Sequence, residues 1–135
     1  MKKYAKIDQS DLPILNVFFT GNIAEENNFE LYLAEIKQVY DLEKTIAIIF
    51  DATSAVLPAT MYQKMQAQWL KDNEKLIQKY CVGTAYIIPN LVIRNVLKAI
   101  FTFQKQPVPY LVCKTMSEAT IWTSEQLKTQ LDNSI

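Results

Sequence analysis

The sequence predicts an α/β fold: one domain over residues 1–135, with a mixed sheet of about five strands and about four helices. Short strand-like runs alternate with longer segments of helical periodicity, in the order β-β-α-β-α-β-α-β-α. Hydrophobic residues make up 50% of the chain, which is enough for a packed core. Right-handed crossovers then predict a mostly parallel sheet, with an antiparallel N-terminal hairpin at one edge.

The N-terminal segment is predicted to form that hairpin and then a helix. Residues 4–8 and 14–20 read as strands separated by turn residues. A helix is expected over 23–42, because apolar side chains there recur at helical spacing. Asn22 is the expected N-cap of this helix, with Glu25 as its capping-box partner.

The middle of the chain is predicted to supply the central strands. Residues 45–50 form a continuous apolar, β-branched run, which is typical of a strand covered on both faces. Pro58 suits the first turn of a helix over 59–79. Residues 81–88 and 110–113 read as further strands.

The last helix is expected to run from about Ser117, its N-cap, to Leu131. Thr115 and Glu118 offer an alternative capping pair one register earlier. This helix completes the predicted order of elements.

Composition excludes several classes of function. The 14 basic and 14 acidic residues cancel, so the net charge offers no electrostatic footprint for nucleic acid or an anionic membrane. The chain has no histidine, which removes histidine-based catalysis and histidine-containing metal sites. Two glycines, Gly21 and Gly83, are too few for a phosphate-binding loop. We therefore expect no enzyme, and no catalytic, cofactor-binding or metal-binding residue.

The two cysteines and the N-terminus indicate a cytoplasmic protein. Cys81 and Cys113 lie in apolar runs without CxxC spacing, which favours buried reduced thiols. No apolar run of signal-peptide type follows the basic first residues. The longest apolar stretch, 81–103, is interrupted by proline, asparagine and charged residues, so no membrane span is expected.

Three short passages occur in this order: Phe-Thr-Gly-Asn-Ile at 19–23, Ile-Ile-Phe-Asp at 48–51 and Ser-Glu-Ala-Thr-Ile-Trp at 117–122. Together they resemble the STAS domain superfamily, the anti-sigma-factor-antagonist fold, and in particular its SpoIIAA-like branch. The resemblance covers most of the chain and implies a regulatory module that binds other proteins. Antagonists of that family carry an Asp-Ser-x-Gly-Leu stretch whose hydroxyl is phosphorylated, whereas residues 51–57 here read Asp-Ala-Thr-Ser-Ala-Val-Leu.

Asp51, Thr53 and Ser54 are the first candidate site. They follow the predicted central strand, at the edge where α/β folds place ligands. A phosphate on either hydroxyl would lie near the start of the next helix, which favours negative charge, and near Asp51, which opposes it. The alternative is structural: Asp51 ends the strand and a hydroxyl caps a turn.

The helix predicted over 91–103 is the second candidate, because it is apolar over more than half of its circumference. Ile93, Leu97 and Phe101 are expected to meet a homodimer partner, another protein, or a lipid or small apolar ligand. For a ligand, the pocket would lie between the sheet and this helix, and Tyr86 and Tyr110 would also line it. The alternative is deep burial of the helix within the domain.

Arg94, on the same helix, is the chain's one arginine. It would clamp a carboxylate or phosphate, or it would be solvated or salt-bridged. The leading hypothesis is a non-catalytic, cytoplasmic regulatory or protein-interaction module without cofactor. The alternative is a small-ligand or lipid-binding domain.

Overall fold

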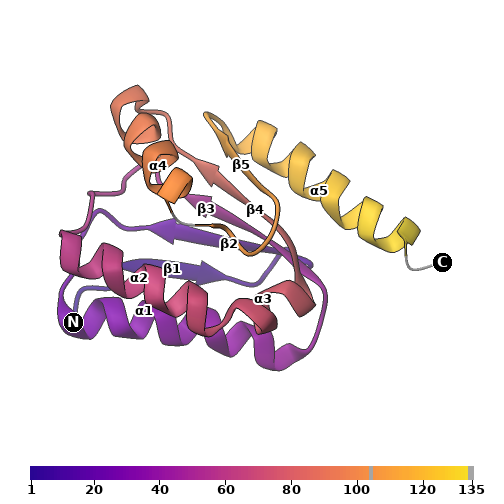
Figure 1. Cartoon of the computed structure of the whole chain (residues 1–135), viewed down its shortest axis with the longest axis horizontal. Helices are drawn as coiled ribbons and strands as arrows, with labels where there is room; N and C mark the ends of the chain where they lie inside the picture. Colours follow the sequence, from indigo (N-terminus) through magenta and orange to yellow (C-terminus); the bar gives the residue numbers. More distant parts are fainter. Residues whose placement is uncertain (104, 134–135) are drawn as a thin grey trace.

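One mixed sheet of five strands forms the centre of the molecule (Figure 1). The computed structural model describes residues 1–103 and 105–133, apart from the side chains of residues 96, 100 and 103. The strands are β1 (Ala5–Asp8), β2 (Ile14–Phe19), β3 (Ile46–Asp51), β4 (Cys81–Ile87) and β5 (Tyr110–Cys113). They lie side by side in chain order, β1 antiparallel to β2 and all other neighbours parallel. The predicted mixed sheet with an antiparallel edge hairpin is confirmed.

Helices cover both faces of this sheet. They are α1 (Glu26–Val39), α2 (Thr60–Asp72), α3 (Glu74–Tyr80), α4 (Leu91–Phe103) and α5 (Met116–Asn133), with a short 3-10 turn, η1 (Tyr40–Leu42). In Figure 1, α1, α2 and α3 lie together on one side of the sheet and α5 lies on the opposite side. Helix α4 stands near the end of the sheet where β4 terminates, so it lies over the carboxyl ends of the strands.

The expected helix over 59–79 is two helices, so the described chain has five α-helices where four were predicted. The break lies at Asn73, whose backbone has φ −110° and ψ 15°. Its side-chain Nδ2 donates a hydrogen bond of 2.8 Å to the carbonyl oxygen of Trp69. An asparagine that bonds local backbone in this way competes with continued helix, which explains the change of direction between α2 and α3.

The start of α1 also differs from the prediction, because Glu25 and not Asn22 is the N-cap. The backbone N–H of Glu25 donates a hydrogen bond of 2.7 Å to Oδ1 of Asn28, which is one arm of a capping box. Asn22 lies too early for this role: its Nδ2 donates to the carbonyl of Lys3 at 2.9 Å and ties the loop to the N-terminal segment.

At the start of α5, the alternative register is the one observed. Oγ1 of Thr115 accepts a hydrogen bond of 3.2 Å from the backbone N–H of Glu118. Thr115 therefore caps the helix, and the prediction of Ser117 as N-cap is wrong. A threonine hydroxyl that receives an N–H three residues later satisfies one of the free donors of the first turn.

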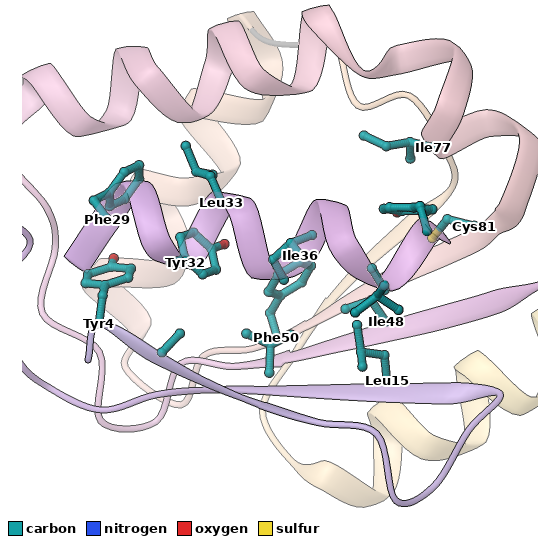
Figure 2. Close-up of a cluster of buried hydrophobic side chains, with 14 of the residues drawn as sticks. Tyr4, Leu15, Phe29, Tyr32, Leu33, Ile36, Ile48, Phe50, Ile77 and Cys81 are labelled. Carbon is teal, nitrogen blue, oxygen red and sulfur yellow. The ribbon is translucent and has the colours of Figure 1, made fainter. Parts of the chain in front are cut away.

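The larger core lies between the sheet and α1. Figure 2 shows Leu15, Ile48 and Phe50 rising from the sheet toward Tyr32 and Ile36 of α1. All five side chains are at least nine-tenths buried. A smaller core on the other face packs β3, β4 and β5 against α5. As predicted, β3 is buried on both faces, and Cys81 and Cys113 are free, buried thiols.

Candidate functional site

An apolar cavity of about 190 Å³ lies on the face of the sheet that α1, α2 and α3 cover (Figure 1), toward the carboxyl ends of the parallel strands. The sheet contributes Phe50, Thr84 and Tyr86 to its wall, among others, and α1 and α2 supply the opposite wall. Ten of the described aromatic side chains line it. Protein interiors are normally packed to the density of organic crystals, so a cavity of this size is a distinctive feature of the core.

A row of aromatic rings connects the sheet to α4 beside this cavity. Phe50 and Tyr86 on neighbouring strands are stacked, with ring centroids 5.1 Å apart and planes 9° apart. Phe101 of α4 packs on Tyr86 at 5.1 Å and edge-on to Tyr110 of β5 at 5.0 Å. Each such pair contributes about 0.5–1.5 kcal/mol beyond its buried area, so Phe101 holds α4 against the sheet.

The apolar side chains predicted from α4 line the cavity. Ile93, Leu97 and Phe101 all face it, together with Tyr86 of β4. Tyr110 does not: it lines a separate, open hollow formed with residues 101–102 and 105–109, and it is 43% exposed. The predicted grouping therefore holds apart from Tyr110, which packs on the outer side of Phe101.

Arg94 is a buried side chain that bonds main-chain carbonyls, and its role as a clamp for a carboxylate or phosphate stays a prediction. Its side chain is 9% exposed, and Nη1 donates hydrogen bonds of 3.2 Å to the carbonyls of Ile88 and Pro89. In the described part of the chain, the ion pair present joins Lys3 to Glu35 and does not involve Arg94. Arg94 thus binds the carbonyl groups that follow β4 and fixes the start of α4. It is neither exposed to solvent nor in a salt bridge with a described residue.

Asp51 and Thr53 are brought together, as a turn. Oδ1 of Asp51 accepts hydrogen bonds from the Thr53 backbone N–H at 3.0 Å and from Thr53 Oγ1 at 2.6 Å. Ser54 is exposed, and its carbonyl oxygen would lie 3.0 Å from a Cβ placed on Gly21, whose φ is +90°. This geometry agrees with the structural alternative, in which the carboxylate at the end of β3 closes a turn.

The same loop contributes residues that the sequence reasoning did not single out. Val56 and Leu57 line the cavity and are each 48% exposed, so they lie between the cavity and solvent. Ala55 and Pro58 beside them also line it. The available signal was an uninterrupted apolar run, 55–58, in a loop, because loops on a protein surface are normally polar.

Few polar groups belong to the cavity wall. The Tyr86 hydroxyl donates a hydrogen bond of 3.1 Å to Oε1 of Gln106. Nε2 of Gln106 is buried without a hydrogen-bond partner. Among the described lining residues there is no aspartate, glutamate, lysine or arginine.

Four tyrosines of the wall have phenol groups that burial holds in the neutral form. Burial raises the pKa of Tyr4 to about 12 and the pKa values of Tyr32, Tyr40 and Tyr86 well above the usual value of 10.0. Loss of hydration, which disfavours the phenolate, is the main cause in each case. The wall is therefore uncharged at neutral pH and offers hydroxyl groups as hydrogen-bonding partners.

Comparison with protein-family models, curated proteins and solved structures finds no match. Within the described residues, no three histidine, cysteine, aspartate or glutamate side chains gather closely enough to hold a metal ion. In the same part of the chain, no helix has the length and apolar character needed to cross a membrane.

Proposed function

We propose that this protein is a non-catalytic domain that binds a small apolar ligand in the cavity enclosed by the sheet, α1, α2 and α4. The observation that carries the proposal is the cavity itself, about 190 Å³ with an apolar, largely aromatic wall. An engineered apolar cavity of about 150 Å³ stays dry and binds benzene. A void of similar character in this core therefore has the capacity to hold a ligand of comparable size.

The mouth of the cavity supports the proposal. Val56 and Leu57 on one side and Ile93 on the other line it, and the first two are half-exposed. A ligand entering between the loop and α4 would meet apolar side chains throughout. Concave, mostly apolar sites with a few polar groups are typical of small-molecule binding.

We propose separately that the chain is related to the STAS superfamily, SpoIIAA-like branch. The antiparallel edge hairpin, the parallel sheet in chain order and the crossing helices are consistent with it. A shared fold does not establish a shared function. The proposal therefore depends on the cavity and not on the resemblance.

The test uses α-methylstyrene, an uncharged hydrocarbon of one ring, with thermal unfolding as the readout. A ligand that binds only the folded state raises the unfolding temperature with concentration. Leu97→Trp places a larger side chain of α4 in the cavity. Val92→Trp is the matched control, because Val92 belongs to the same helix but is 71% exposed. We expect the shift in wild type and Val92→Trp and its loss in Leu97→Trp. Equal shifts in both variants would place binding elsewhere.

A second candidate, a protein-interaction module, is favoured by the outer side of α4. Leu91 and Val92 are 61% and 71% exposed, and Met61 at the start of α2 is 59% exposed. Exposed apolar side chains of this size are typical of contact surfaces for a second copy or another protein. Native mass spectrometry distinguishes the candidates: a dimer that Val92→Asp converts to a folded monomer supports interaction, and a monomer with added ligand mass supports binding.

A further inference from the structure

We infer that the ligand is an uncharged molecule of about one substituted ring carrying a hydrogen-bond acceptor, and that the side-chain amide of Gln106 binds this acceptor. The inference rests on the proposed function and specifies its ligand. Three properties of the cavity wall carry it: the absence of charge among its described residues, an unpaired buried N–H, and its size and aromatic lining.

The absence of charged side chains in the described wall excludes ionic ligands. The described residues that line the cavity include no acidic or basic side chain. Arg94, the nearby guanidinium on α4, is already bound to the carbonyls of Ile88 and Pro89 and is not among the lining residues. A carboxylate, phosphate or ammonium group would lose its hydration without gaining a counter-charge, which is strongly unfavourable.

The polar groups of the wall then select the ligand's polar atom. Tyr86 donates to Oε1 of Gln106, which fixes the amide with Nε2 on its other side. That Nε2 is buried and has no partner. A buried donor left unpaired costs about 1–3 kcal/mol, so a ligand acceptor that reaches it removes this cost.

Size and ring geometry select the rest of the molecule. The cavity volume of about 190 Å³ is moderately larger than the roughly 150 Å³ that accommodates benzene. The nearly parallel rings of Phe50 and Tyr86, 9° apart, form part of the wall. Aromatic rings favour offset-stacked or edge-to-face partners, so a planar ring with one small acceptor substituent fits best.

The experiment compares three probes of nearly the same shape by isothermal titration calorimetry at neutral pH. They are acetophenone, which has a carbonyl acceptor, α-methylstyrene, in which a CH₂ group replaces that oxygen, and benzoate, which is charged. We expect acetophenone to bind about fivefold more tightly than α-methylstyrene, the gain of one net hydrogen bond. Benzoate is expected to bind most weakly of the three.

Gln106→Met tests the assigned amide and keeps the volume of the side chain. Its affinity for α-methylstyrene should change by less than about twofold, and the preference for acetophenone should disappear. Gln66→Met is the matched control, because Gln66 also lines the cavity but belongs to α2. The control should keep the preference, and its loss there would overturn the assignment to Gln106.

A measurement on the unmodified protein makes the test independent of whether Gln106→Met folds. Side-chain amide signals in ¹⁵N spectra should include one, from Gln106, that moves with acetophenone and not with α-methylstyrene. Equal affinities for these two probes, or tighter binding of benzoate, would overturn the inference and leave the cavity as a ligand site. Failure of all three probes to bind would overturn the proposed function itself.

Discussion

The hydroxyl of Tyr86 in β4 donates a hydrogen bond of 3.1 Å to Oε1 of Gln106, in the segment that follows α4. The ring of Tyr86 also packs on Phe101 near the end of α4. One side chain in the sheet thus contacts both the helix and the connection that leads from it to β5. The position of α4, and with it one wall of the cavity, depends on this residue.

Tyr86→Phe is expected to loosen α4 while the sheet stays intact. The change keeps the ring contacts but removes the hydroxyl, which leaves both polar atoms of the Gln106 amide unpaired. The expected cost is about 1–2 kcal/mol. Hydrogen exchange should become faster over residues 91–109. Tyr110→Phe, at a ring that is 43% exposed, is the control and should leave exchange unchanged; faster exchange in both would contradict the assignment.

Gly83→Ala is expected to destabilise the other face of the sheet. A Cβ at Gly83 would lie 2.8 Å from Cη2 and 3.1 Å from Cζ3 of Trp122 in α5, closer than carbon atoms pack. Overpacking of this kind costs about 1–3 kcal/mol, measured as the free energy of unfolding in urea. Trp122→Phe removes both atoms, so the double variant should lose less stability than the sum of the single variants. Additive losses would show that the two residues do not compete for space.

Periodicity was sufficient to predict the sheet and most helices, because each element buries its own apolar pattern. It could not predict the break between α2 and α3. That break depends on the hydrogen bond from the side chain of Asn73 to the carbonyl of Trp69. The sequence does not show whether an asparagine inside a helical pattern will make such a bond. The position of the N-cap of α1 likewise depends on a hydrogen bond from the side chain of Asn22 to the carbonyl of Lys3, which is distant in sequence.

The candidate site was predictable where it depended on excess apolar surface. The apolar circumference of α4 indicated a further contact, and Ile93, Leu97 and Phe101 line the cavity. Arg94 was not predictable, because its hydrogen bonds go to carbonyl groups whose positions are set by the end of β4. Unlike the caps at helix starts, these hydrogen bonds have no residue spacing that sequence reading recognises.

Phe101→Asp is expected to cost about 2–3 kcal/mol, because it removes two ring contacts and places a charge beside apolar side chains. Val92→Asp, on the same helix but 71% exposed, should change stability by no more than about 0.5 kcal/mol. Urea unfolding followed by circular dichroism measures both. Equal losses of stability would mean that Val92 is also covered in solution, as the interaction hypothesis requires. Unchanged stability in both variants would mean that Phe101 does not hold α4 against the sheet.

The stability of the fold is expected to fall steeply in alkaline solution. Burial raises the pKa of Cys81 from 9.0 to about 11 and that of Tyr4 from 10.0 to about 12. The folded chain keeps these protons where the unfolded chain releases them, so their contribution is complete below pH 9 and is lost as the pH rises toward 12. Each group contributes a slope of up to about 1.4 kcal/mol per pH unit. Urea midpoints should be constant from about pH 7 to 8.5 and then decline, less steeply in Tyr4→Phe. A wild-type midpoint that stays constant to about pH 11 would show that these groups are hydrated in the native state.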